Sequence, residues 1–171
     1  IISSSAGVWG YNTGDTVRFT SLSPYKIDVT GRIKQSLSAF GEHVIVKEVE
    51  QAIGNAISKT GILVKEFTVA PRFKSKTSSA SHEWFIEFDE IQNDTKVFAY
   101  EIDKELQRQN KYYKDLIVGK IIDKPIIRSV VKDGFKIYMD SIGKLGGQNK
   151  IPKVANDRKI ANQLKNLNLI E

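Results

Sequence analysis

A loop rich in glycine and lysine near the end of the chain carries the residues best suited to chemistry. It runs from Gly143 to Lys153, and Lys144, Lys150 and Lys153 make it strongly basic on either side of Pro152. Glycine lets a loop change its backbone conformation, and proline stiffens the exit. Such a loop can close over a reacting phosphate, supply positive charge where negative charge develops and exclude water. The simpler interpretation is a solvated basic loop.

A second group of candidate residues lies near the beginning of the chain, where Tyr11, Gly14 and Asp15 form a Y-x-x-G-D motif. An aspartate in a turn at the mouth of a strand can accept two hydrogen bonds from vicinal hydroxyls, such as those of a ribose. The alternative is an aspartate that caps its own turn. A G-R-x-K motif follows at residues 31–34, and taken alone it is typical of a turn with a solvated charge.

The order and spacing of these motifs resemble the junction between the two domains of adenylate-forming enzymes, the superfamily of acyl-CoA synthetases, luciferases and peptide-synthetase adenylation domains. The loop at residues 143–153 narrows the resemblance to the Gretchen Hagen family, the auxin-responsive acyl acid amido synthetases, in a bacterial-type version. The resemblance covers nearly the whole chain but only the C-terminal part of such an enzyme. The chain also begins without methionine, as expected for a piece of a longer protein or a processed product.

The resemblance implies a nucleotide-binding role for Tyr11, Asp15 and Arg32. Of these, Asp15 and Arg32 match residues that contact the ribose in such enzymes. Lys34 matches the hinge on which the C-terminal domain turns between two half-reactions. That role needs a residue at an element boundary that tolerates new φ and ψ values.

Within the loop, the resemblance makes Lys150 the catalytic residue in preference to Lys144, because Lys150 has the expected position relative to the proline. Residues of the same loop are implied to support it: Gly146, Gly147, Gln148 and Pro152. The family pattern N-Q-Y-K-T-P-R ends in arginine, where this chain has Lys153. We interpret that difference as a conservative departure.

The activity implied by the resemblance is a two-step ligase reaction. A small carboxylic acid attacks the α-phosphate of ATP to give an acyl-adenylate and pyrophosphate, and the amine of an amino acid then takes the acyl group and releases AMP. Like-charge repulsion and a charged transition state in the first step require a cationic loop and Mg²⁺. The Mg²⁺ ligands, the adenine site and the acyl pocket are expected in the chain's own N-terminal domain, so this piece is expected to be inactive alone.

Two other functions are compatible with the sequence. A thioester-forming enzyme similar to acyl-CoA ligases would form the same adenylate but pass the acyl group to a thiol. A non-catalytic basic module could bind RNA or an acidic partner, since the net charge is +6. Basic and acidic residues are interspersed in every segment, however, so we do not expect a nucleic-acid partner.

Composition places the chain among ordinary globular proteins. Of its 171 residues, 40% are apolar and 27% are charged. No run approaches the roughly eighteen apolar residues of a membrane helix, which excludes a membrane span, and the start does not resemble a signal peptide. The absence of cysteine excludes disulfides, thiolate zinc sites and cysteine nucleophiles. A cytoplasmic location fits these features.

Hydrophobic patterning predicts an α+β fold, a mixed or antiparallel β-sheet flanked by helices. At the start, Ile1 and Ile2 are expected to end a strand, followed by a plain loop to Trp9. A hairpin of strands 15–20 and 26–30 is predicted next, and then a helix over 46–59. Two strands, over 62–70 and 82–89, precede a helix that carries Phe98, Ile102 and Leu106. A strand over 125–131 is followed by two helices, one that begins after Asp133-Gly134 and one that begins after the caps Asn156-Asp157. Pro71 is expected to close the strand that precedes it.

The same patterning predicts the domain organisation. The composition changes after Gly31, and we place a domain boundary at residues 32–35. The resemblance to adenylate-forming enzymes then implies that residues 1–33 are a β-hairpin left over from the N-terminal AMP-binding domain. It likewise implies that residues 34–171 form the mobile C-terminal domain.

The histidines and the glutamates near the first helix receive no catalytic role. His43 and His82 are far apart and have no carboxylates at ligand spacing, so no metal site is predicted. His82 is interpreted as a residue at a sheet edge in preference to a substrate contact. Glu42 is interpreted as a loop residue, and Glu48 and Glu50 as the solvated first turn of a helix, which the helix dipole favours.

Overall fold

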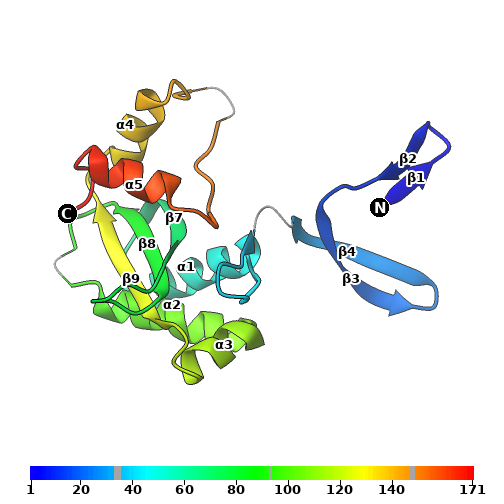
Figure 1. Cartoon of the computed structure of the whole chain (residues 1–171), viewed down its shortest axis with the longest axis horizontal. Helices are drawn as coiled ribbons and strands as arrows, with labels where there is room; N and C mark the ends of the chain where they lie inside the picture. The colour runs from blue at the N-terminus through cyan, green and yellow to red at the C-terminus, as the bar shows by residue number, and fades with distance from the viewer. Residues whose placement is uncertain (33–35, 93, 147–148) are drawn as a thin grey trace.

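A computed structural model describes residues 1–32, 36–92, 94–146 and 149–171. The chain begins with two antiparallel hairpins, which Figure 1 draws to one side of the remaining elements. Strands β1 (Ile2–Ser4) and β2 (Val8–Tyr11) form the first, and β3 (Asp15–Leu22) and β4 (Tyr25–Arg32) form the second. The predicted hairpin is therefore confirmed, whereas the loop expected from Ser3 to Trp9 is a hairpin of its own.

The rest of the chain, which we call the body, is built on a three-stranded sheet in the order β7-β8-β9. Strands β7 and β8 are antiparallel, and β8 and β9 are parallel, so the predicted mixed sheet with flanking helices is confirmed (Figure 1). The elements of the body are β5 (Ser36–Leu37), β6 (Val44–Ile45), α1 (Val46–Thr60), β7 (Val64–Arg72), β8 (Ser81–Phe88), α2 (Lys96–Gln109), α3 (Lys111–Val118), β9 (Asp123–Val130), α4 (Gly134–Ser141) and α5 (Lys159–Asn166).

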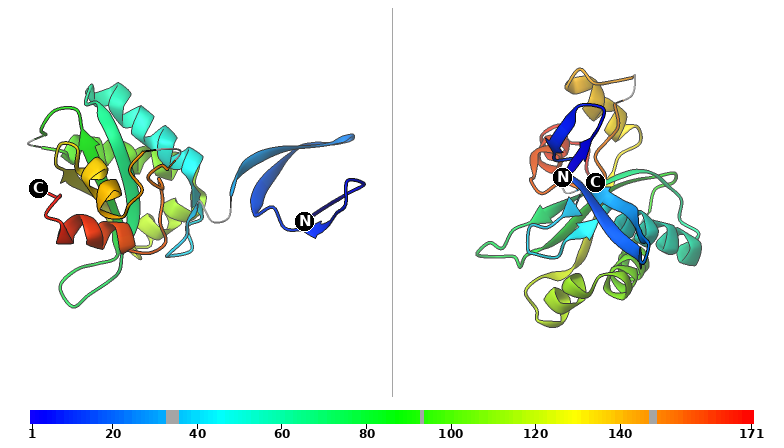
Figure 2. Two further views of the ribbon diagram at one scale, coloured as in Figure 1. Left: turned by 90° about the horizontal axis from the view of Figure 1, so that it is seen from above. Right: turned by 90° about the vertical axis from the view of Figure 1, so that its right-hand side faces the viewer.

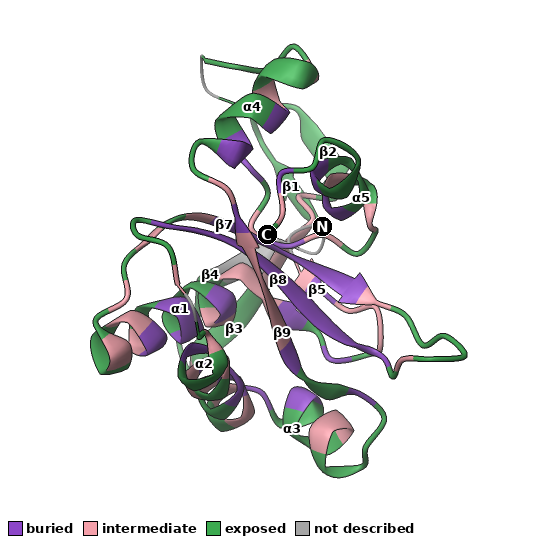
Figure 3. Cartoon of the chain, turned by 90° about the vertical axis from the view of Figure 1, so that its left-hand side faces the viewer, coloured by how far each residue is buried: buried purple, intermediate pink, exposed green. Residues whose placement is uncertain are grey.

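Both faces of this sheet are covered, because side chains alternate along each strand. On β8, Trp84 and Ile86 pack in one core with α1 and α2, whereas Phe85 packs in a second core with α4 and α5. Figure 3 shows β8 buried along its length between these helices. Seen from above, in the left view of Figure 2, the hairpins again lie to one side of the body.

The helix boundaries follow from local signals in the sequence. Helix α1 ends at Gly61, whose φ of 72° is left-handed and whose N–H donates to Ile57 O over 2.8 Å. Asp94 Oδ1 accepts the N–H of Lys96, the first residue of α2, over 2.8 Å. Within the described residues, no helix combines the length and the apolar character that crossing a membrane requires.

Two further expectations about the elements are wrong. Pro71 does not close a strand, because β7 continues through it to Arg72 and Pro71 pairs with His82 of β8. Proline lacks an N–H donor, and an outer strand such as β7 tolerates that loss better than a central one. Helix α3 was not predicted. Its eight residues present a single buried side chain, Tyr113, which is too little for a periodic stripe.

Candidate functional site

The structure places two of the predicted nucleotide-binding residues opposite each other. Asp15 opens β3, Arg32 ends β4, and the two are direct partners in the antiparallel register. Partners in such a register lie about 5 Å apart at Cα. Two residues that lie 17 positions apart in the chain are thereby brought together at one end of the hairpin.

The turn before Asp15 is closed by other side chains. Asn12 Oδ1 accepts the N–H of Gly14 over 2.9 Å, and Thr13 Oγ1 accepts the N–H of Asp15 over 3.2 Å. Gly14 has a φ of 69°, which favours glycine. Tyr11 ends β2 with an exposed ring.

Lys150 lies on the body, apart from the hairpin residues. Its side chain is exposed and lines two cavities. One, of about 300 Å³, lies beside Phe135 and Met139 of α4, and the other, of about 520 Å³, lies beside Val46 and Glu50 of α1. Lys150 is thus the loop lysine that faces both the α4 side and the α1 side of β7.

The chain directly after Lys150 is fastened to β7. Thr68 Oγ1 donates to Pro152 O over 2.7 Å, Val69 N–H donates to Lys153 O over 3.0 Å, and Ala155 N–H donates to Val69 O over 2.9 Å. Val154 consequently pairs with Val69 in a parallel bridge. We call residues 152–155 the loop anchor.

Lys153 contributes to the same anchor through its side chain. Its ammonium group forms an ion pair with Glu66 and lies 4.5 Å from the centre of the Phe67 ring. Lys153 therefore holds the loop against β7, whereas Lys144 and Lys150 are both exposed and both line the cavity beside α4. Gly146, on the other side of the loop, has a φ of 86°. Gly147, Gln148 and Lys34 lie outside the described residues.

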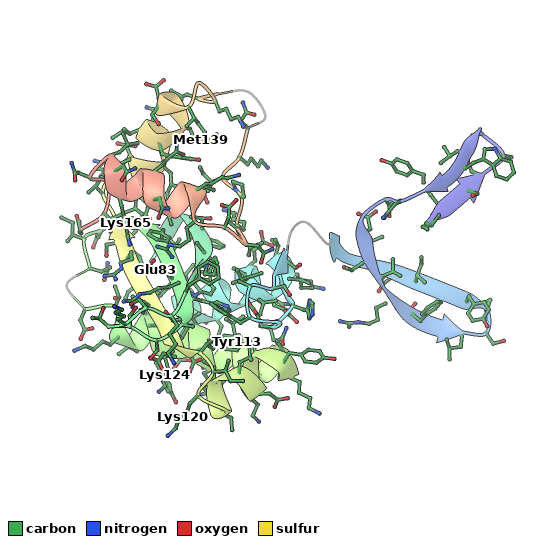
Figure 4. The ribbon with its side chains drawn as sticks, viewed as in Figure 1. Glu83, Tyr113, Lys120, Lys124, Met139 and Lys165 are labelled. Atoms are coloured by element: carbon green, nitrogen blue, oxygen red, sulfur yellow. The ribbon has the colours of Figure 1, made fainter. Side chains whose placement is uncertain are left out.

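A buried carboxylate secures the chain beyond the anchor. Glu83 of β8 is almost fully buried and binds Arg128 Nε at 2.9 Å and Arg158 Nη2 at 2.6 Å, while Lys165 Nζ lies 3.9 Å away. Burial raises the pKa of Glu83, but the hydrogen bonds and charges of these cations outweigh it and lower the pKa below its ordinary value. Figure 4 shows Glu83 and Lys165 on the α5 side of the sheet.

A second buried carboxylate on the same face fixes the start of α4. Glu87 accepts the N–H groups of Asp133 over 2.9 Å and Phe135 over 3.4 Å. A carboxylate at a helix N-terminus satisfies donors that have no partner within the helix. Through α4, Glu87 positions one wall of the cavity beside Lys150.

The opposite face of β8 carries a buried pair that sequence reasoning missed. His82 Nε2 and Glu42 Oε1 lie 2.9 Å apart, and Glu42 Oε2 accepts the N–H of Phe40 over 2.8 Å. The prediction of His82 as an edge residue is wrong, because β8 is the middle strand and His82 is buried. Burial raises the pKa of Glu42, but the hydrogen bond and charge of His82 outweigh it and lower the pKa below its ordinary value.

Aromatic rings enclose this pair. The His82 ring stacks between Phe40, at 5.9 Å, and Tyr113, at 5.5 Å. Tyr113 in turn donates its hydroxyl hydrogen to Asp103 over 2.9 Å. Burial and the negative charge of Asp103 raise the pKa of Tyr113 well above its ordinary value. The loop that contains Glu42 is therefore locked into the α3 side of the body.

Comparison with known proteins gives the family. The model of the GH3 family C-terminal domain matches residues 47–159, well over half of the chain. The chain belongs to the GH3 family. A search of curated proteins found no match.

Solved structures share the fold of this GH3 chain. It superposes on a GH3.15 acyl acid amido synthetase with a TM-score of 0.71 at 18% identity, covering 99% of this chain and 33% of the other. A second match, AtGH3.15 acyl acid amido synthetase in complex with 2,4-DB, gives a TM-score of 0.69 at 18% identity and coverages of 99% and 32%. The GH3 chain therefore spans about a third of the length of these structures.

The candidate residues of the GH3 chain lie in two places. Asp15 opens β3 of the hairpin, and the exposed residue Lys150 lies on the body. Among the described residues, no three His, Cys, Asp or Glu side chains gather in a way that could hold a metal ion.

The residues missed by sequence reasoning share one cause. Glu42, His82, Glu83 and Glu87 are all buried, although such residue types are mostly exposed. Alternation with Trp84 and Ile86 could have placed His82 on the core face. Nothing local indicated that the glutamates on the other face were also covered.

Proposed function

We propose that this chain is the C-terminal portion of an ATP-dependent acyl acid amido synthetase of bacterial type. Membership of the GH3 family carries the proposal, and the position of Lys150 between two cavities supports it. The substrates are a small carboxylic acid, ATP and the amine of an amino acid. Residues 1–33 complete the N-terminal AMP-binding domain, and residues 34–171 are the mobile C-terminal domain, with Lys34 as the hinge.

Each half-reaction makes a different demand on these residues. In the first, a carboxylate oxygen attacks the α-phosphorus, and the bond to pyrophosphate breaks. Lys150 offsets the negative charge that gathers on the phosphate oxygens, while Tyr11, Asp15 and Arg32 hold the nucleoside. In the second, the amine nitrogen attacks the acyl carbon, loses a proton and displaces AMP.

The chain's own N-terminal domain supplies what this piece lacks. It would provide the adenine site, the acyl pocket and the ligands of Mg²⁺, which would offset the negative charge of the phosphates. The 171-residue chain is accordingly a folded domain without turnover of its own. Measurable synthesis of an acyl amide by the isolated chain would contradict this part of the proposal.

The deciding experiment is pyrophosphate exchange into ATP by the full-length protein, measured against a panel of carboxylic acids. We expect exchange that depends on the acid and falls about 100- to 1,000-fold in Lys150→Ala, the usual effect of removing a group that stabilises charge in a transition state. Lys114→Ala, on the exposed surface of α3, is the matched control and should retain the wild-type rate. No exchange with any acid would overturn the proposal.

Product analysis identifies the acceptor. With an active acid, the full-length protein should consume an amino acid and form an amide with release of AMP. Formation of a thioester with a thiol such as coenzyme A, and no amide, would instead assign the protein to the thioester-forming ligases.

A further inference from the structure

Asn156 does not do what its sequence context predicts. The pair Asn156-Asp157 was expected to cap the last helix, and Asp157 does accept the N–H of Lys159 over 2.9 Å. Asn156 instead reaches across to residues 36–38. Its Nδ2 donates to Ser36 O over 2.6 Å, and its Oδ1 accepts the N–H of Ser38 over 2.7 Å.

The geometry of this contact copies strand pairing. In an extended segment, the carbonyl of one residue and the N–H of the residue two positions later point to the same side. A side-chain amide has one acceptor and a donor group side by side, so Asn156 satisfies both backbone groups at once. No other side chain of similar size offers this combination, since aspartate lacks the donor and leucine lacks both.

Asn156 joins two segments that have different roles in the proposed function, the loop anchor and residues 36–38. On one side, Asn156 follows the loop anchor, residues 152–155, which fixes the chain beyond Lys150. On the other, residues 36–38 are the first described residues after Lys34. They lead directly to Glu42, which is locked to His82.

We propose that Asn156 is a positioning residue that couples the Lys150 loop to the segment following the hinge, so that the two move as one unit when the domain turns. The inference rests on the proposed function for the role of Lys150. Asn156 touches neither nucleotide nor substrate in this proposal. It acts by fixing where Lys150 stands relative to the hinge.

Amide hydrogen exchange tests the mechanical link without any catalysis. In the full-length protein, Asn156→Ala should speed exchange of the Ser38 N–H about three- to tenfold, the equivalent of one lost hydrogen bond. The Ala155 N–H, which donates to Val69 in the loop anchor, should speed up with it. Asn162→Ala, at an exposed position of α5, is the matched control. Faster exchange at Ser38 with no change at Ala155 would overturn the coupling.

A kinetic cycle then tests the consequence for Lys150. Asn156→Ala should lower the rate of adenylation about 10- to 100-fold, as expected when a catalytic group is misplaced by about 1 Å, with the KM for ATP unchanged within about twofold. Asn156→Asp, which keeps the acceptor and loses the donor, should be intermediate between Asn156→Ala and wild type.

The double variant separates positioning from general damage. If Asn156 acts through Lys150, Lys150→Ala with Asn156→Ala should be no slower than Lys150→Ala alone. Additive losses, or equal losses in adenylation and in transfer from a supplied acyl-adenylate, would overturn the proposal. Wild-type exchange that depends on the acid, together with its loss in Lys150→Ala, reports on the proposed function separately.

Discussion

Large apolar side chains are exposed on the hairpins and buried in the body, as the chain's two tryptophans illustrate. Trp9 on β2 is 84% exposed, whereas Trp84 on β8 is completely buried. The body covers both faces of its sheet with helices, while the β3–β4 hairpin exposes Phe19 and Ile27 at facing positions. A two-stranded hairpin is marginally stable by itself. The body therefore carries the stability of the chain, and binding is only the role that we propose for residues of the hairpins.

The largest expected effect is the loss of the Trp84 ring. Trp84→Ala should lower the free energy of unfolding by about 3–5 kcal/mol, because it leaves a cavity between the sheet and α1 and α2. Trp9→Ala should change it by less than about 0.5 kcal/mol. Denaturant unfolding of the two variants measures the difference. Trp84→Phe, with an expected loss below about 3 kcal/mol, keeps the test available if Trp84→Ala fails to fold.

Next in size is the removal of the charge of Glu83. Glu83→Gln leaves Arg128 and Arg158 without a buried counter-ion, and we expect a loss of about 3 kcal/mol. The surface pair of Glu105 with Arg108 is the matched comparison, and Glu105→Gln should cost clearly less because solvent screens it. Equal losses in the two variants, measured by chemical denaturation, would show that the Glu83 cluster contributes no more than an exposed ion pair.

The sequence predicted the elements that depend on local periodicity, but it did not predict the burial of these glutamates. The stripe of α1 and the alternation of Trp84, Ile86 and Phe88 depend on local periodicity, so they predicted a helix and a strand that the structure confirms. The alternation does not say what covers the opposite face of the strand, where Glu83 and Glu87 lie. Glu83 and Glu87 are buried there because β9 and the starts of α4 and α5, from other parts of the chain, bring cations and N–H donors to them.

In the candidate site, too, the sequence indicated what local motifs record and missed the long-range contacts. Local motifs singled out Asp15, Arg32 and Lys150, and the hairpin register then joined the first two. The contact of Asn156 with residues 36–38 spans 118 and 120 positions, and no local pattern records it. A helix-cap interpretation was the better local explanation for an Asn-Asp pair, and it was correct for Asp157 alone.

A smaller effect is expected from Glu42, and it depends on pH. A carboxyl whose pKa is lower in the folded state stabilises the protein above its unfolded value, 4.5, and loses that contribution as the pH falls through the folded pKa. Glu42→Gln should cost about 1–2 kcal/mol at neutral pH, where it weakens a hydrogen bond to a charged group. The free energy of unfolding should then fall less steeply below pH 4.5 than in wild type.

Unfolding of both proteins between neutral pH and pH 3 measures that slope. Glu83, whose pKa is also lowered, remains in the variant, so part of the acid sensitivity should persist. An unchanged slope in Glu42→Gln would show that the pair with His82 does not contribute to acid unfolding. No corresponding effect is expected from the hairpin residue Asp28, which is exposed and serves as the control in Asp28→Asn.

The smallest effect in the 171-residue chain is expected on the hairpin, and its size should depend on how much of the protein is present. Ile27 is 53% exposed and faces Phe19 across the β3–β4 pair. In the 171-residue chain, Ile27→Ser should change the free energy of unfolding by less than about 0.5 kcal/mol. In the full-length protein, where we propose that the N-terminal domain covers this face, the same change should cost about 1–3 kcal/mol through lost apolar burial. A negligible effect in both contexts would mean that the face stays in solvent, and a large effect in the short chain would mean that the hairpin already packs on the body.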